Sequence, residues 1–308
     1  MIVMEPTVAK PTAKLCGMYP ILTTTYHDDE SLDLPSMKKL IDYLIEEGVD
    51  GVVTLANGSE GHVMSDAEKQ ELGREVIKCV DGRVPVIISI THFSSKIAAE
   101  KAAWAQKEGA DAVMSLPPFF GKWKAPLGKI RDYLKTVSDA VDIPLILQDH
   151  PLSDINLSAG DLCGLIDDVP GLDYLKMEVD TSAVKVGDVM AGARDTFQGI
   201  FTGMGALRLF WELEAGAIGC MPACVPAKPL AKIIHLHWEG KRDESFELVR
   251  TWLPFLLWLL NVGRRDIVKE YLVMKGIIES PKLREPNITA WNDWARTQYE
   301  YLLEKCEM

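Results

Sequence analysis

Residues 84–116 read VPVIISITHFSSKIAAEKAAWAQKEGADAVMSL. Two short runs of apolar and β-branched residues, 84–90 and 112–116, flank a helical pattern over 94–108 that stops at Gly109. Strands that are apolar along their whole length are typical of parallel sheets buried on both faces, and glycine commonly follows the last residue of a helix. The stretch is therefore predicted to form a strand, a helix and a second, parallel strand.

The same alternation continues on both sides of this unit, at a spacing of roughly thirty residues, which is the usual length of one such unit. A helix is also predicted to begin after Ser65, because Glu68 three residues later completes a capping box. Strands alternating with helices predict an α/β fold, a (β/α)8 TIM barrel, whose active site lies at the carboxyl ends of the strands. The predicted strands are 18–24, 51–55, 84–90, 112–116, 144–148, 174–177, 196–200 and 217–221.

An open, doubly wound sheet is the alternative architecture. It requires a glycine-rich phosphate-binding turn after its first strand, but residues 22–25 at that place read Leu-Thr-Thr-Thr. From about residue 236 the pattern changes to tryptophan-rich apolar helices without further strands. We therefore predict a barrel over residues 1–235, which carries the reactive site, and a C-terminal helical extension over 236–308.

Composition restricts the partners of the chain. Its 308 residues carry a formal net charge of −12, which argues against nucleic acid and anionic membranes, because both require a basic surface. The N-terminus lacks a signal-peptide pattern, and the most apolar run, 252–262, is too short to span a bilayer. The six cysteines include no CxxC pair, as expected for free thiols in a reducing compartment. A cytoplasmic protein that acts on a small molecule is expected.

Lys176 is the most informative single residue, since it lies in the run LDYLKME at 172–178. A buried ammonium ion is costly, so burial favours the neutral amine. A neutral amine can attack a ketone and form a Schiff base. The alternative is a lysine at a strand end whose ammonium group reaches solvent.

Polar residues follow the predicted strands where a barrel holds its active site. Asn57-Gly58-Ser59 ahead of a helix could present N–H groups and a hydroxyl to a carboxylate, although the same residues also suit a plain turn. His92 and His150 could each move protons or serve only a structural role. No histidine spacing typical of a metal site occurs in the sequence, so no metal is expected.

Glu178 is the first candidate for a base that acts with Lys176. The two residues are two positions apart, so on a regular strand their side chains face the same side. His92 and a water molecule held by Gln148 are the competing candidates.

These segments together resemble the dihydrodipicolinate synthase/N-acetylneuraminate lyase superfamily, whose members are class I aldolase-type barrels. The segments that carry the resemblance are 17–24, 57–60, 117–120, 148–151 and the strand with Lys176. The resemblance implies that Lys176 forms the Schiff base and that no cofactor is needed beyond this covalent imine. It also implies a homotetramer or a dimer of dimers.

The chain departs from most members of that superfamily at the tyrosines that move protons in aldol cleavage. Gln148 replaces the tyrosine of strand five, and the tyrosine pair after strand four reads Phe119-Phe120. The arginine that dihydrodipicolinate synthases place after the Pro151 segment is missing from Leu152-Ser153-Asp154. These differences argue against a dihydrodipicolinate synthase and against a sialic-acid-type aldolase.

One branch, the 2-keto-3-deoxy-L-arabonate dehydratases, resembles the chain more closely. Its Ala-Asn-x-Ser-Glu, His-aromatic-Ser, Pro-Pro-aromatic and Gln-Asp-x-Pro motifs occur at 56–60, 92–94, 117–119 and 148–151. The resemblance implies a carbon–oxygen lyase of carbohydrate metabolism that converts a 2-keto-3-deoxy sugar acid to 2-oxoglutarate semialdehyde. The alternatives are a retro-aldol lyase that releases pyruvate and a catalytically inactive, metabolite-binding barrel.

The predicted site thus combines a catalytic set with a substrate-binding set. The catalytic set is Lys176, Gln148, Glu178 and His92, and the substrate-binding set is Asn57, Gly58, Ser59, Phe119, His150 and Gly199.

Overall fold

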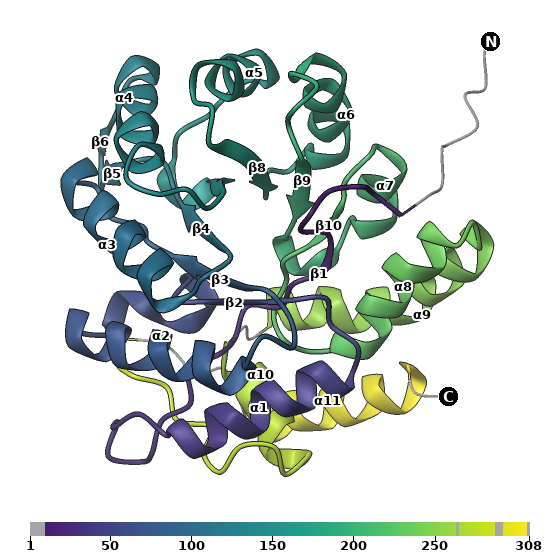
Figure 1. Cartoon of the computed structure of the whole chain (residues 1–308). Coiled ribbons are helices and arrows are strands. Elements are labelled where there is room, and N and C mark those ends of the chain that lie inside the picture. The colour runs from purple at the N-terminus through teal and green to yellow at the C-terminus, as the bar shows by residue number, and fades with distance from the viewer. Residues whose placement is uncertain (1–9, 263–264, 287–291, 307–308) are drawn as a thin grey trace.

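A barrel of parallel strands surrounded by helices forms the main part of the chain (Figure 1). The computed structural model describes residues 10–262, 265–286 and 292–306. The strand order in the sheet is β1-β10-β9-β8-β7-β4-β3-β2. The strands are β1 (Gly17–Met18), β2 (Val52–Thr54), β3 (Val86–Ser89), β4 (Ala112–Ser115), β7 (Leu145–Asp149), β8 (Leu172–Met177), β9 (Gly199–Thr202) and β10 (Gly219–Cys220).

The barrel closes between β2 and the chain that follows β1. The N–H of Val53 donates to the carbonyl oxygen of Pro20 at 3.0 Å, and the N–H of Leu22 donates to that of Val53 at 2.8 Å. The predicted TIM barrel with C-terminal helices is therefore confirmed.

Helices that alternate with the strands along the chain cover the outside of the barrel (Figure 1). The predicted capping box is present, since Ser65 Oγ accepts from the N–H of Glu68 and Glu68 Oε2 accepts from the N–H of Ser65. Gly109 ends its helix in the left-handed conformation, with a φ of +108°. The helices are α1 (Leu34–Glu46), α2 (Asp66–Val80), α3 (Ser95–Glu108), α4 (Leu127–Ser138), α5 (Ala159–Asp168), α6 (Ser182–Gly192), α7 (Leu209–Glu214) and α8 (Ala227–Trp238).

Every strand of the barrel lies at its predicted place, but three strands differ substantially from their predicted ranges. The strands predicted over 18–24 and 217–221 are each reduced to two regular residues, in β1 and β10. Pro20 and Pro222 have no N–H to donate, which interrupts the ladder in both. The strand predicted over 196–200 begins only at Gly199, because the N–H of Phe197 is bonded in a turn to the carbonyl oxygen of Arg194.

A short hairpin was absent from the predicted elements. It consists of β5 (Phe119–Phe120) and β6 (Trp123–Lys124), which pair in antiparallel fashion. Gly121 turns the chain with a φ of +57°, a conformation that glycine adopts without steric cost. Lys124 forms an ion pair with Asp154, which ties the hairpin to the loop after β7.

Strand periodicity determines where Lys176 points. Leu175 and Met177 of β8 belong to the apolar layer between the sheet and the helices, whereas Tyr174 packs inside the barrel with Phe201. Lys176 follows Tyr174 by two residues, so its side chain faces the barrel interior. Because it lies near the carboxyl end of β8, its amine is directed to the end of the barrel where a site is expected.

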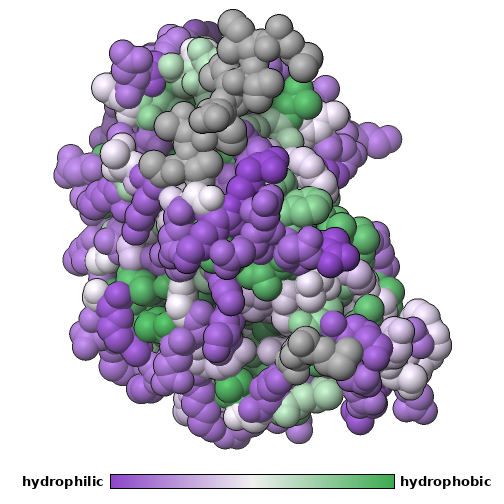
Figure 2. Space-filling view, turned by 90° about the vertical axis from the view of Figure 1, so that its right-hand side faces the viewer, coloured by the Kyte–Doolittle hydropathy of each residue, from purple (hydrophilic) through white to green (hydrophobic). Residues whose placement is uncertain are grey.

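The C-terminal part is helical, with α9 (Arg242–Asn261), α10 (Arg265–Met274) and α11 (Asp293–Cys306). The predicted domain boundary between residues 235 and 236 lies inside α8. A division of the chain into two domains there stays a prediction. Within the described ranges, no helix is both long and apolar enough to cross a membrane. The face shown in Figure 2 is mostly hydrophilic, with small, separated hydrophobic patches.

Candidate active site

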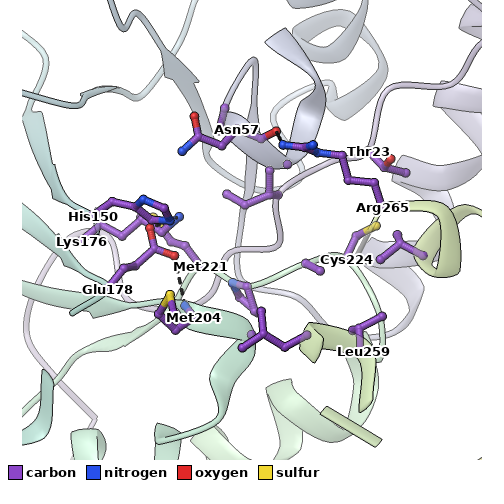
Figure 3. Close-up of a pocket in the computed structure, with 18 of the residues that line it drawn as sticks. Thr23, Asn57, His150, Lys176, Glu178, Met204, Met221, Cys224, Leu259 and Arg265 are labelled. Atoms are coloured by element: carbon purple, nitrogen blue, oxygen red, sulfur yellow. Dashed lines mark hydrogen bonds and ion pairs between the residues drawn. The ribbon is translucent and has the colours of Figure 1, made fainter. Parts of the chain in front are cut away.

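A cavity of about 320 Å³ opens at the carboxyl ends of the barrel strands and extends to the C-terminal helices. Lys176, Glu178 and His150 group together in Figure 3, with Asn57, Thr23 and Arg265 on another side of the cavity. Leu256, Leu259, Leu260 and Val268 from α9 and α10 add an apolar wall. Polar groups are thus concentrated at the strand ends, as in a site that orients one end of a small ligand.

Lys176 forms a buried ion pair inside this cavity. Its Nζ lies 3.1 Å from Glu178 Oε2, and the two side chains are only 4% and 8% exposed. The prediction that both face the same side is confirmed. The pair brings a nucleophilic amine and a carboxylate within reach of one bound molecule.

The Glu178 carboxylate is fixed by two further donors. Gln148 Nε2 donates to Oε2 at 2.5 Å, and the N–H of Met204 donates to Oε1 at 3.0 Å. Gly203 leaves the room for this arrangement, since a Cβ there would lie 2.2 Å from Oε1. The carboxylate therefore has one well-defined position beside the lysine.

Electrostatics keep Glu178 ionised. Burial opposes its ionisation, but the charges of Lys176 and His150 and the hydrogen bonds from Gln148 and Met204 together hold its pKa below the ordinary value. A carboxylate that is ionised and oriented can accept a proton from a ligand atom. Gln148 contributes by orienting this group, because an amide neither gains nor loses a proton at neutral pH.

The Asn57–Ser59 segment forms a three-residue 3₁₀ turn, and α2 begins only at Asp66. The segment lies ahead of a helix, as expected, but Glu60 in the left-handed conformation, with a φ of +58°, and a second 3₁₀ turn over Gly61–Val63 separate it from α2. Asn57 and Gly58 line the cavity, and Ser59 lies buried behind them. Asn57 Nδ2 and Ser59 Oγ are buried without a hydrogen-bond partner among the described residues.

His150 lines the cavity beside Lys176 (Figure 3). Its Nδ1 accepts a hydrogen bond from the N–H of Leu152 at 2.8 Å, which orients the ring. Asp149 points away from the cavity and forms a buried ion pair with Lys185 of α6, with 2.6 Å between Oδ2 and Nζ. This pair fixes the end of β7, from which both Gln148 and His150 extend.

Four predicted residues are not part of the cavity lining, namely the buried Ser59 and also His92, Gly199 and Phe119. His92 accepts from the N–H of Ser94 and stacks on Phe93, and burial together with the charge of Lys101 lowers the pKa of the imidazole. Gly199 begins β9 beside Tyr174, two residues before the level of Lys176. Phe119 belongs to the β5–β6 hairpin. A role for these residues stays a prediction that the geometry does not support.

Several residues that line the cavity were not among the site residues predicted from the sequence. Thr23 lies in the loop after β1 and Met204 begins a 3₁₀ turn after β9, and the strand pattern could have suggested both positions. Arg265 had no such signal, since it begins a helix in the C-terminal extension, and only the packing of α10 brings it to the cavity. Among the described residues, no group of three or more His, Cys, Asp or Glu side chains is placed to hold a metal ion.

Comparison with known proteins gives consistent results. The sequence pattern of the dihydrodipicolinate synthetase family matches residues 14–305. An L-2-keto-3-deoxyarabonate dehydratase from Azospirillum brasilense is 34% identical over 275 residues, which are 88% of each chain. "Probable 2-dehydro-3-deoxy-D-pentonate aldolase YjhH" from Escherichia coli (strain K12) is 30% identical over 179 residues, 54% of this chain and 59% of its own. The crystal structure of dihydrodipicolinate synthase from Rhodopseudomonas palustris superposes with a TM-score of 0.88 at 25% identity, over 96% of this chain and 99% of that one.

Proposed function

Because the chain belongs to the dihydrodipicolinate synthetase family, we propose that it is a Schiff-base-forming hydro-lyase that dehydrates a 2-keto-3-deoxy sugar acid. The first candidate substrate is 2-keto-3-deoxy-L-arabonate, the compound in the name of the Azospirillum brasilense relative. The observation that carries the proposal is the Lys176–Glu178 pair, with 3.1 Å between amine and carboxylate in a cavity. No cofactor enters the proposal, since the imine itself withdraws electrons from the substrate.

The substrate carboxylate is assigned to the Asn57–Ser59 turn. Asn57 Nδ2, which has no hydrogen-bond partner within the described part of the chain, supplies a donor there, and Gly58 lines the cavity beside it. Binding at this turn directs the neighbouring C2 ketone of the substrate to Lys176, which lines the same cavity (Figure 3). The distal carbons then extend toward the wall formed by α9 and α10.

The reaction begins at the Lys176 amine, whose proton can pass to Glu178. The neutral amine adds to C2, and the resulting C2 hydroxyl leaves as water with the proton that Glu178 returns, which gives a protonated imine and a free Glu178 carboxylate. Glu178 then removes a proton from C3, and the electron pair of that C–H bond forms an enamine. The enamine expels the C4 hydroxyl, which leaves as water with the proton that Glu178 returns.

Completion of the reaction needs only proton shifts. Transfer of a proton from C5 to C3 gives an enol, which becomes the C5 aldehyde when C4 is protonated. Hydrolysis of the imine then releases 2-oxoglutarate semialdehyde and restores Lys176. The balance is the loss of one water molecule from the substrate. A positioned base contributes roughly 10²–10⁴-fold to such a proton transfer.

Retro-aldol cleavage to pyruvate is a second candidate, favoured by the similarity to the Escherichia coli protein named as an aldolase. In that reaction Glu178 would take the proton of the C4 hydroxyl, and the bond between C3 and C4 would break. Mass spectrometry of the products from 2-keto-3-deoxy-L-arabonate separates the two reactions, since one yields a semialdehyde and the other yields pyruvate.

Borohydride trapping tests the covalent step that both reactions share. Incubation with pyruvate and borohydride should add a reduced pyruvate group to the peptide that contains Lys176, and Lys176→Ala should abolish the adduct. Absence of the adduct from the folded wild-type protein would instead support a barrel that only binds metabolites.

We also propose a homotetramer or a dimer of dimers as the working assembly. Trp123 on the β5–β6 hairpin is 79% exposed, and Leu152 in the loop that Asp154 ties to this hairpin is 52% exposed. Exposed apolar side chains of this size suit a contact between protein chains. Native mass spectrometry at micromolar concentration tests the assembly, and a single monomeric species would contradict it.

A further inference from the structure

The turn assigned to the substrate carboxylate is held from the C-terminal helix α10. Arg265 Nη2 donates to the carbonyl oxygen of Asn57 at 2.9 Å, a bond drawn in Figure 3. Four residues later, Lys269 Nζ lies 2.6 Å from Glu60 Oε1, and both of these side chains are completely buried. Residues four apart share one face of a helix. Side chains on one face of α10 therefore bind both ends of the segment from Asn57 to Glu60.

The segment has a backbone shape that requires such support. Leu55 and Glu60 both adopt left-handed conformations, with φ values of +59° and +58°, which are unfavourable for residues other than glycine. The turn also packs closely, since a Cβ on Gly58 would lie 2.9 Å from Ile21 and one on Gly61 would lie 2.8 Å from the carbonyl oxygen of Leu55. Contacts elsewhere in the fold must therefore stabilise this conformation.

Lys269 stabilises the turn through its ion pair with Glu60, and it does not line the cavity. Its Nζ also donates to the carbonyl oxygen of Lys282 at 2.6 Å and lies 4.7 Å from the centre of the Tyr26 ring. The N–H of Arg284 donates to Glu60 Oε2 at 3.3 Å. The buried charge of Glu60 is thus compensated by residues of the C-terminal extension, and a buried carboxylate without such partners would be strongly destabilising.

We propose that α10 sets the geometry of the carboxylate-binding turn, with Arg265 and Lys269 as positioning residues for recognition of the 2-keto acid. This inference rests on the proposed function, because it assumes that the turn binds the substrate carboxylate at Asn57 and Gly58. It makes a specific prediction about ligand charge. Loosening the turn weakens binding of a charged 2-keto acid, while an uncharged ketone still reaches Lys176 equally well.

The experiment compares trapping of pyruvate with trapping of its uncharged methyl ester by borohydride. The variants are Arg265→Met and the double variant Glu60→Gln/Lys269→Met, which removes both buried charges together so that neither is left unpaired. For both variants, the pyruvate concentration that gives half-maximal trapping should rise about tenfold, as expected when a charge-assisted hydrogen bond is lost. The corresponding concentration of methyl pyruvate should stay within about twofold of the wild-type value.

Two further variants sharpen the comparison. Arg265→Lys keeps a donor for the carbonyl oxygen of Asn57 and should recover part of the pyruvate affinity. Arg250→Met removes a surface arginine of α9 whose ion pair within the described ranges is with nearby Glu247, and this variant should trap both probes as the wild-type protein does.

The outcomes are distinct. Wild-type pyruvate affinity in both variants would overturn the inference and leave the proposed function standing. A loss of pyruvate affinity in Arg265→Met alone would also overturn the inference, because Arg265 would then act on the ligand directly. Equal losses for pyruvate and its ester would show a general disruption of the site and contradict it. If the wild-type protein trapped no pyruvate, the proposed function and the inference would both fail.

Discussion

Gln148 Nε2 donates a hydrogen bond to Glu178 Oε2, and the same oxygen lies 3.1 Å from Lys176 Nζ. The amide and the amine thus converge on one carboxylate from the neighbouring strands β7 and β8. At the position of Gln148, most members of the superfamily that the sequence resembles carry a proton-moving tyrosine. In this chain Gln148 occupies that position and orients the carboxylate of Glu178 instead. Glu178 is therefore the central group of the proposed proton transfers.

Glu178→Gln should lower kcat by about 10²–10⁴-fold on the proposed substrate, because the amide cannot take the C3 proton. Trapping of pyruvate on Lys176 should continue at a lower rate, since the amine that forms the imine is still present but has lost the carboxylate proposed to take its proton. Steady-state kinetics and peptide mass spectrometry check the two parts. Turnover at the wild-type rate would exclude Glu178 as the base.

His92→Ala should leave turnover within about twofold of the wild-type value, because His92 lies outside the cavity lining. A loss comparable to that of Glu178→Gln would show that His92 is the base and that the site rearranges when substrate binds. Measurement of kcat for both variants on one substrate decides between the two candidates.

Gln148→Leu should change the pH dependence of catalysis. Removing the amide takes away one of the interactions that lower the pKa of Glu178, so the carboxyl group keeps its proton to a higher pH. The acidic limb of kcat/KM should therefore move to higher pH in the variant than in the wild-type protein. An acidic limb at the wild-type pH would show that Gln148 does not affect the pKa of Glu178.

Gly203→Ala should reduce activity by about 10²-fold, since a displacement near 1 Å at a reacting group has an effect of this size. The new Cβ would overlap Glu178 Oε1 and force the carboxylate to move. Gly187→Ala on α6 is the matched control, because a Cβ there meets no atom within 4 Å. The control should keep full activity and gain about 0.5–1 kcal/mol in the free energy of unfolding. Equal activity in both variants would show that the Glu178 carboxylate tolerates displacement.

His235 lies at the amino-terminal end of the barrel, and it should make the folding stability of the protein depend on pH. Its Nε2 lies 2.9 Å from Asp50 Oδ2, and this hydrogen bond raises the pKa of His235 against the opposing effect of burial. The stabilisation is fully present below the unfolded-state pKa of about 6.5 and is lost as the pH rises through the folded-state value.

The difference in Tm between the wild-type protein and His235→Gln should therefore be larger at about pH 5.5 than at about pH 8.5. Thermal unfolding followed by circular dichroism at the two pH values measures this. A difference that grows with pH would contradict the assigned role of the pair.

Local chemistry in the sequence predicts much of the barrel. The capping box at Ser65, the stop at Gly109 and the apolar strand runs depend only on near neighbours, and the structure retains them. The prolines that shorten β1 and β10 are also visible in the sequence, but their effect depends on which strand lies beside them. The hairpin at 119–124 was missed because two-residue strands are too short for a periodic pattern.

The sequence by itself determined that Lys176 lies on a buried strand and that Glu178 faces the same side, since both follow from the period of two in a strand. Only the tertiary structure decided which distant residues meet them. Gln148 reaches Glu178 through the register of β7 and β8, and Arg265 reaches Asn57 through the packing of α10 on the barrel. Such contacts join segments far apart in the chain, and they depend on how the whole fold packs rather than on any local pattern.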